Sequence, residues 1–184
     1  GRVYRCRLFY GNGTARLVRE STWRDDGSGV VHDLGSHLLD TIQFWFGRTL
    51  DDFSVYSSNR FENKSPDHVV FGAESVLPKI ECELSLLSWR NSFRADIVGE
   101  EGSIHVDSLC KWSESTLTVR RRILPSGVPR ETVEVVAKGD PTWKLEYEHF
   151  KVLCARRSPT DLTNDRKLQQ SLNRLGSEAI RMSI

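Results

Sequence analysis

The sequence predicts an α+β fold in which a large, mainly antiparallel, open-faced sheet has its helices packed on one side. Polar and apolar residues alternate through residues 79–89, as in a strand with one covered and one open face. Other strand-like segments are joined by short connections, which specify antiparallel neighbours. At 184 residues and with no internal linker, the chain suits a single domain, residues 1–184, with one well-buried core.

The strands are expected in hairpins. Residues 4–10 alternate in polarity and lead into a Gly-Asn-Gly-Thr turn, which predicts a first hairpin with residues 15–20. Two later hairpins are predicted as well, 94–98 with 103–107 and 117–124 with 131–137.

Helices are expected on both sides of this strand-rich middle. Pro141 starts one helix, whose loose apolar side consists of Leu145, Phe150, Val152 and Leu153. The last helix is marked by apolar residues at helical spacing, namely Leu168, Leu172, Leu175, Ala179 and Ile180.

The helix beginning near Gly29 carries the candidate site. Asp33, His37, Asp40 and Phe44 fall within an arc of about 60° on such a helix. The other side is apolar, with Leu34, Leu38, Leu39, Ile42, Trp45 and Phe46. A carboxylate four residues before a histidine can orient the ring, raise its pKa and make it a proton acceptor or donor near neutral pH. Asp33 and His37 are therefore the candidate catalytic pair, with Asp40 in support.

A satisfied polar pair at a domain edge is the alternative interpretation of Asp33 and His37. The pair supplies only two ligands and no third is evident, so no metal site is expected. Gly35 lies where a better helix former would be expected, which indicates close approach of a strand or a ligand. His32 points about 100° away from Asp33 and is interpreted as structural. The other histidines, His68, His105 and His149, have no partner spacing and are assigned no chemistry.

The loop of residues 21–28 leads directly into this helix. Trp23 and Arg24 offer a stacking surface and hydrogen-bonding groups of the kind that hold a polyhydroxylated ring, and they are the candidate substrate-binding residues. The alternative is that Trp23 packs over the sheet while Asp25 and Asp26 cap the start of the helix.

Composition narrows the class of protein. A formal net charge of +1 gives no electrostatic case for nucleic acid or an anionic membrane, and residues 120–122 are interpreted as a basic, solvated strand edge. No apolar run approaches the length of a membrane span. The four cysteines have no paired spacing, which argues against a zinc module and favours reduced thiols in a cytoplasmic protein.

Three stretches resemble one known family. Residues 27–40, Gly-Ser-Gly-Val-Val-His-Asp-Leu-Gly-Ser-His-Leu-Leu-Asp, are similar to the Gly-rich Asp-x-Gly-x-His-x-x-Asp helix of the glucose-fructose oxidoreductase and inositol dehydrogenase family, the Gfo/Idh/MocA group. The arginine-rich start resembles the opening strand of that family's second domain, and residues 96–106 resemble its Gly-x-x-Gly-x-Ile hairpin. Phe150, a Ser-Pro-Thr-Asp loop and Ser177 follow the family's order.

The resemblance implies the C-terminal, substrate-binding and oligomerisation domain of an oxidoreductase, with a fold like the C-terminal domains of dihydrodipicolinate reductase and glyceraldehyde-3-phosphate dehydrogenase. It implies hydride transfer between NAD or NADP and a sugar, cyclitol or related polyol, with His37 as acid/base and Asp33 orienting it. The cofactor would be bound mainly by an N-terminal Rossmann domain, whose Gly-x-Gly-x-x-Gly turn and catalytic lysine are not in this chain. The isolated chain is then expected to be inactive.

Assembly is expected through the open face of the sheet, as a homodimer or homotetramer, because that face must be covered or polar. The residues considered for an apolar patch are Trp112, Leu117, Val119, Val133 and Val135. Two alternatives stay open, a non-catalytic interaction module of the same fold and a related reductase of a non-sugar substrate.

Overall fold

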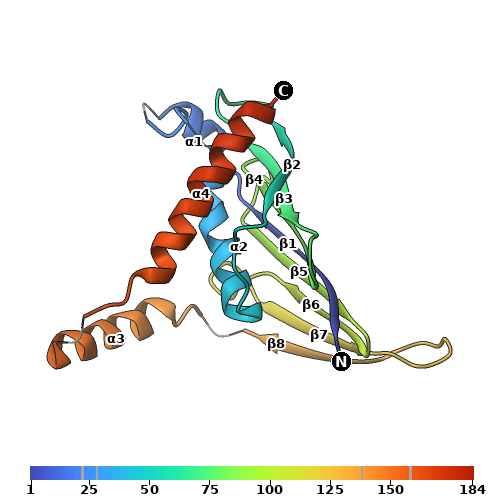
Figure 1. The fold of residues 1–184 in the computed structure, drawn as a ribbon. Helices are drawn as coiled ribbons and strands as arrows, with labels where there is room; N and C mark the ends of the chain where they lie inside the picture. The colour runs from blue at the N-terminus through green and yellow to red at the C-terminus, as the bar shows by residue number, and fades with distance from the viewer. Residues whose placement is uncertain (22, 28, 138, 158) are drawn as a thin grey trace.

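A computed structural model describes residues 1–21, 23–27, 29–137, 139–157 and 159–184 (Figure 1). Eight strands form one sheet in the order β2-β3-β4-β1-β5-β6-β7-β8. The strands are β1 (Val3–Gly11), β2 (Ser54–Asn59), β3 (His68–Ala73), β4 (Lys79–Ser85), β5 (Ser92–Gly99), β6 (Gly102–Asp107), β7 (Ser115–Arg121) and β8 (Arg130–Val136). The helices are α1 (Ala15–Arg19), α2 (Val30–Phe46), α3 (Thr142–Arg156) and α4 (Thr163–Met182).

The sheet is antiparallel except at its centre, where β1 and β4 run parallel. The two later hairpins are confirmed: β5 pairs with β6 and β7 pairs with β8, each in antiparallel register. The mainly antiparallel sheet expected from the sequence is therefore correct. The edge pair β2 and β3 had not been predicted, because its residues alternate less regularly.

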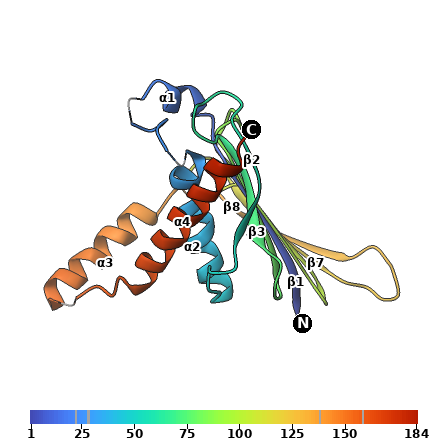
Figure 2. The ribbon, with the colours of Figure 1, turned by 45° about the horizontal axis from the view of Figure 1, so that its top comes forward.

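The helices lie on one side of the sheet (Figure 2). Helix α2 packs on β1, β3 and β4, and α4 packs on α2 and β2. The predicted apolar residues of α4 include Leu172, Leu175 and Ala179, which are all buried. Helix α3 instead projects away from the sheet (Figure 1), and its described residues include no buried one. None of the helices described is long and apolar enough to cross a membrane.

The predicted hairpin between residues 4–10 and 15–20 is wrong. Both edges of β1 are already paired, with β4 on one side and β5 on the other. After β1 the Asn12 side-chain oxygen accepts hydrogen bonds from the backbone N–H and the hydroxyl of Thr14, which turns the chain into the short helix α1. Ala15 and Val18 are buried three residues apart, a helical spacing.

The core lies between the sheet and helices α2 and α4. The alternation predicted for residues 79–89 is confirmed in β4, where Ile80, Cys82 and Leu84 are buried. Gly35 of α2 allows a close approach, since a Cβ placed there would lie 3.1 Å from the Leu172 side chain of α4. A strand or a ligand was expected beside Gly35; the nearest side chain instead comes from helix α4, and Leu84 of strand β4 follows at 3.5 Å.

The cysteines are free thiols. Burial, followed by the negative charge of Asp96, raises the pKa of Cys6 to about 12. Burial also raises the pKa of Cys82 well above its usual value. Both thiols of the core are therefore protonated and unreactive near neutral pH.

Candidate functional site

The loop before α2 is fixed by contacts with the segment before β3. The Asp25 carboxylate accepts hydrogen bonds from the backbone N–H groups of Lys64 (3.1 Å) and Ser65 (2.7 Å), so Asp25 does not cap α2. Gly29 has φ of 53°, and a Cβ there would lie 2.1 Å from the carbonyl oxygen of Pro66. That carbonyl accepts the backbone N–H of Val30 at 2.9 Å. The start of α2 is thus held against the segment before β3.

Asp33 is paired with Arg24, whose Nη2 lies 2.6 Å from the Asp33 carboxylate oxygen Oδ1. Both side chains are about seven-tenths buried. They line a hollow of about 300 Å³ with Trp23 and His32, while Trp23 itself is 75% exposed. The structure therefore brings three predicted site residues together, Trp23, Arg24 and Asp33. His32, interpreted as structural, lines the same hollow.

His37 lies one turn further along α2 and outside the lining of that hollow. Its side chain is exposed, but its ring stacks on the ring of Tyr10 from β1, with centroids 5.0 Å apart and 19° between the planes. In the described part of the chain no hydrogen bond joins the His37 ring to Asp33. The predicted pair therefore shares a helix face without a hydrogen bond between the two side chains among the described contacts.

The surroundings of His37 include residues that the sequence had not indicated as site residues. The edge of the Trp112 ring meets Tyr10 at a centroid distance of 5.5 Å. Lys111 donates from Nζ to the Tyr10 hydroxyl at 3.3 Å. Lys111 and Trp112 come from the loop between β6 and β7, and no spacing pattern connects that loop with α2.

The pKa of His37 moves opposite to the sequence prediction. Partial burial, followed by the positive charge of Lys111, lowers the pKa of His37 below its usual value. Asp33 and Asp40 act to raise that pKa, but they are the smaller influences. The predicted rise is therefore wrong. His37 is neutral at neutral pH and can accept a proton.

The predicted division of α2 into an apolar buried side and a polar exposed side is only partly correct. Asp40 is exposed on the His37 side, as expected, and Phe44 is 85% exposed. Leu34, Leu38, Leu39 and Ile42 are buried. Trp45 was expected to pack inside but is 37% exposed, whereas its neighbour Phe46 is partly buried against the core.

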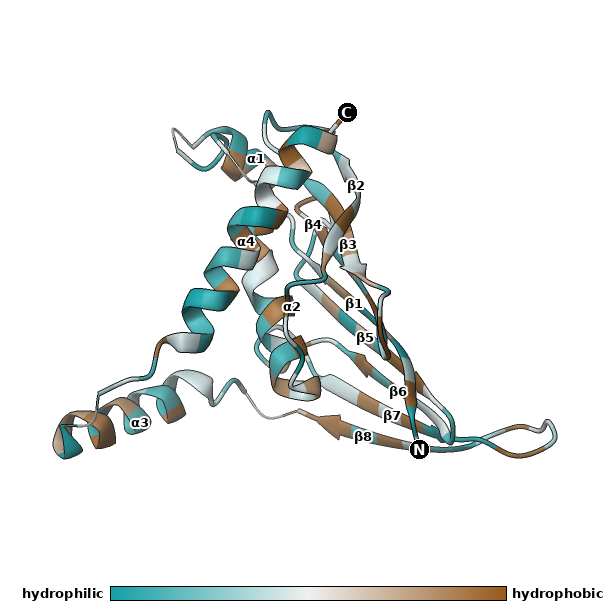
Figure 3. Ribbon diagram, in the orientation of Figure 1, coloured by the Kyte–Doolittle hydropathy of each residue, from teal (hydrophilic) through white to brown (hydrophobic). Residues whose placement is uncertain are grey.

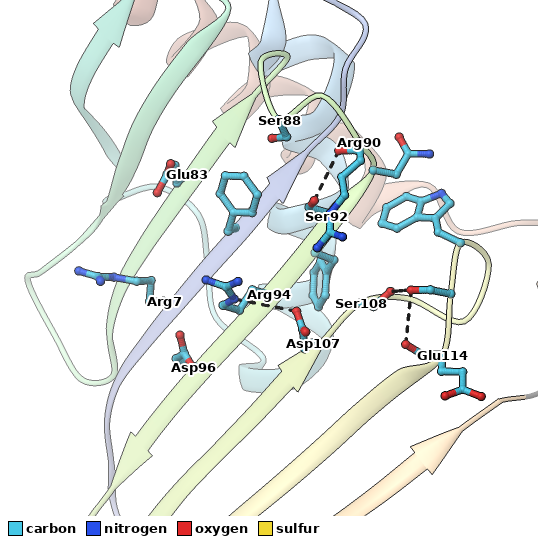
Figure 4. Close-up of a pocket in the computed structure, with 15 residues that line it drawn as sticks. Arg7, Glu83, Ser88, Arg90, Ser92, Arg94, Asp96, Asp107, Ser108 and Glu114 are labelled. Carbon is cyan, nitrogen blue, oxygen red and sulfur yellow. Dashed lines mark hydrogen bonds and ion pairs between the residues drawn. The ribbon is translucent and has the colours of Figure 1, made fainter.

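A second, larger hollow of about 900 Å³ lies on the open face of the sheet (Figure 4). Its lining includes Arg7, Arg94, Asp96 and Asp107, together with aromatic Phe9. None of the site residues predicted from the sequence lines it, but its lining includes Trp112, whose ring also meets Tyr10 beneath His37.

The open face is largely polar. Arg7 lies 2.6 Å from Glu81, and Arg120 lies 2.6 Å from Glu131. Leu117 and Val119 pair with Val106 and Ile104, which places them on the helix side. The expectation that they join an open-face apolar patch is therefore wrong. Val133 and Val135 pair with Thr118 and Thr116, so they lie on the open face.

His105 of β6 also lies on the open face, where cross-strand register gives it partners. Its Nδ1 lies 2.5 Å from Asp96 of β5, and its Nε2 lies 2.8 Å from the Ser103 hydroxyl and 3.1 Å from Arg120 of β7. Arginine can only donate, so Nε2 accepts and Nδ1–H donates to Asp96. These four residues are called the His105 cluster below. Sequence spacing had indicated no partner for His105.

Metal-ligating side chains do not gather in the described residues: no group of three His, Cys, Asp or Glu is placed to hold an ion.

Comparison with known proteins points to one family. Residues 1–105 match the model of the GFO/IDH/MocA C-terminal domain. UDP-N-acetylglucosamine 3-dehydrogenase from Acidithiobacillus ferrooxidans has a similar structure, with a TM-score of 0.74 at 17% identity over 99% of this chain and 55% of its own. Levoglucosan dehydrogenase in complex with NADH and L-sorbose gives 0.73 at 16% identity, over 100% and 58%.

An oxidoreductase domain protein from Kribbella flavida is 21% identical with a TM-score of 0.56, over 77% of this chain and 41% of its own. No curated protein matches the sequence. The chain spans little more than half the length of the two dehydrogenases, and at these identities the structural likeness describes the fold. The family match covers more than half of the sequence, including β1, α2 and most of the sheet. The chain therefore belongs to the GFO/IDH/MocA family, and it matches the family's C-terminal domain.

Proposed function

We propose that this chain is the substrate-binding domain of an NAD- or NADP-dependent oxidoreductase that acts on a sugar, cyclitol or related polyol. The observation that carries the proposal is the shared face of α2, where His37 stacks on Tyr10 and Asp33 binds Arg24. Family membership and the sugar dehydrogenases of similar fold support the class of reaction.

His37 is the proposed acid/base. Oxidation of a secondary alcohol requires removal of the hydroxyl proton as hydride leaves the carbon, and a neutral imidazole can accept that proton. The lowered pKa of His37 keeps the ring neutral at neutral pH. In the reverse direction the protonated ring returns the proton to the carbonyl oxygen. Tyr10 fixes the plane of the ring, so the proton-accepting nitrogen has a defined direction.

Arg24 and Asp33 form the proposed polyol contact. The Arg24 guanidinium has further N–H donors beyond the one that Asp33 accepts, and the Asp33 carboxylate has further acceptor sites. Vicinal hydroxyls both donate and accept, so an Arg–Asp pair suits them. Trp23, 75% exposed beside the same hollow, supplies an apolar face for the ring.

The described residues do not fit a dinucleotide. A Cβ on Gly13 would lie 2.9 Å from the backbone of Trp89, and one on Gly29 would strike Pro66, so these glycines are packed against the chain itself. A pyrophosphate needs an open glycine turn at a helix start. Binding of the nicotinamide cofactor and its redox chemistry is therefore assigned to a preceding Rossmann domain.

The exposed apolar side chains of helix α3 are consistent with a surface on which a second domain docks. Trp143 is 78% exposed and Phe150 is 59% exposed, and apolar residues recur along the helix (Figure 3). So large an apolar surface indicates a binding partner. The predicted apolar side of α3 would then face the Rossmann domain.

Self-association through the open face belongs to the same proposal, as a dimer or tetramer in the cytoplasm, where the free thiols are stable. The Arg–carboxylate pairs of that face provide polar complementarity, and Val133 and Val135 provide apolar contact.

The test is steady-state kinetics of the full-length enzyme on a panel of polyols, followed by NAD(P)H absorbance. We expect His37→Ala to lower kcat by about 100-fold or more, since it removes the positioned base, with little change in cofactor affinity. His68→Ala is the control, because His68 of β3 lines neither of the two hollows, and it should change kcat far less. Wild-type turnover by His37→Ala would disprove the acid/base assignment.

A further inference from the structure

Lys111 occupies an unusual position for an exposed lysine. Its Nζ lies 3.3 Å from the Tyr10 hydroxyl, 4.7 Å from the centroid of the Trp112 ring and 6.0 Å from that of Tyr10. In the described part of the chain no carboxylate lies within ion-pair distance of Nζ. The ammonium is therefore held by aromatic rings and a hydroxyl. Its charge also contributes to lowering the pKa of Asp140, although the two groups do not form an ion pair.

The same Tyr10 ring also supports His37. The Tyr10 and His37 rings stack at 5.0 Å, and Trp112 and Phe93 meet Tyr10 edge-on at 5.5 and 6.1 Å. Tyr10 is 5% exposed, so it cannot move without disturbing the core. Lys111 thus binds the buried ring on which the proposed acid/base rests.

We propose that Lys111 is a positioning residue of the His37 site: it ties the β6–β7 loop to Tyr10 and places a positive charge beside the His37 ring. This inference rests on the proposed function for its catalytic consequence. Its electrostatic part concerns His37 alone and can be measured without turnover.

The charges around His37 come from three elements. Asp33 and Asp40 lie on α2 itself, Lys111 lies on the β6–β7 loop, and Arg24 lies on the loop before α2. Arg24 binds Asp33 at 2.6 Å and so offsets much of the negative charge nearest to His37. Adding a proton to His37 therefore brings a second positive charge next to Lys111, which is unfavourable.

The direction in which the pKa of His37 shifts agrees with this arrangement of charges. Partial burial and then Lys111 lower the pKa of His37, and the two aspartates act against them. Because these charges act in opposite directions, two opposite shifts in the pKa of His37 are expected. Removing the lysine charge should raise the pKa of His37, and removing the Asp40 charge should lower it.

The experiment is an NMR titration of 13C-labelled histidine in the protein, with the His37 signal assigned by His37→Ala. We expect Lys111→Met to raise the His37 midpoint by about 0.5 pH unit, and Asp40→Asn to lower it. Lys111→Arg keeps the charge and should leave the midpoint near that of the wild type. Lys151→Met is the control, because Lys151 also lies over an aromatic ring, Tyr147, but on the distant helix α3.

The kinetic arm uses the acid limb of the kcat/KM profile of the full-length enzyme, which should move to higher pH in Lys111→Met and stay in place in Lys151→Met. An unchanged His37 midpoint in Lys111→Met would overturn the inference. A shifted midpoint with an unshifted kinetic limb would instead retain the electrostatic role of Lys111 and refute His37 as the base.

Discussion

His37 and His105 lie on opposite sides of the sheet and find their partners in opposite ways. His37 has a carboxylate four residues before it on α2, yet that carboxylate binds Arg24 while the ring stacks on Tyr10. His105 has no carboxylate at a matching spacing, yet Asp96 lies 2.5 Å from it across the β5–β6 register. Sequence spacing thus identified the helix face but not the contacts made on it.

Side chains that are hydrogen-bonded in the order serine, histidine, aspartate do not by themselves define an active site. The His105 cluster contains serine, histidine and aspartate connected in the order found in nucleophilic sites. Arg120, however, donates to the same Nε2 that would have to accept the serine proton. A cross-strand polar network is the simpler account of the His105 cluster, and the catalytic role that we propose stays with His37 of α2.

The largest expected effect is a difference in kcat between variants of Asp33, beside His37, and Asp96, beside His105. Asp33→Asn should lower kcat by about 10-fold or more, because Arg24 loses its charged partner and His37 loses a nearby negative charge. Asp96→Asn, on the open face, should leave kcat within about twofold. The measurement is kcat on the best polyol substrate for both variants. Equal losses would place the His105 cluster in the catalytic machinery.

A smaller effect is expected on assembly through the open face. Val135→Asp should weaken self-association by about tenfold, because it buries a charge in an apolar contact. Val128→Asp is the control, since Val128 is 89% exposed in the connection between β7 and β8. Light scattering across a dilution series measures the mass. A strictly monomeric wild type at tens of micromolar would refute assembly through the sheet.

The smallest expected effect is on stability. Arg24→Met removes a partly buried ion pair and should cost about 1–2 kcal/mol of unfolding free energy. Arg120→Met removes a pair more than two-fifths exposed and should cost about 0.5 kcal/mol or less. Urea unfolding of both variants measures the difference. A larger loss in Arg120→Met would show that the His105 cluster contributes more to stability than an exposed pair usually does.

Local patterns were enough to predict much of the sheet. Alternation in β4 and the short connections of β5–β6 and β7–β8 are local signals, and all three were predicted. Both partners of β1 were missed because they are distant in sequence: Arg5 pairs with Lys79 of the parallel strand β4 and with Val98 of β5. Residues 15–19 were misassigned because the hydrogen bonds of Asn12 to Thr14, which start the turn into α1, are not visible in polarity alternation.

In the candidate site, too, the residues close in sequence were predicted, and those brought together by tertiary packing were missed. Asp33, His37 and Asp40 lie on one helix, so helical periodicity brings them together. Tyr10, Lys111 and Trp112 come from β1 and a distant loop, and only the packed sheet places them beside α2. The direction of the His37 pKa depends on Lys111 and burial, so it could not be predicted from the spacing of Asp33 and His37.

Helix α3 has a consequence for exchange dynamics. It is 15 residues long with no buried side chain among those described, and a helix of that length is marginal in water without tertiary packing. Its amide hydrogens should therefore exchange with solvent much faster than those of α2, whose apolar side is enclosed by the sheet and α4. A domain that docks on α3 would slow that exchange, so deuterium uptake by residues 142–156 reports directly on domain docking.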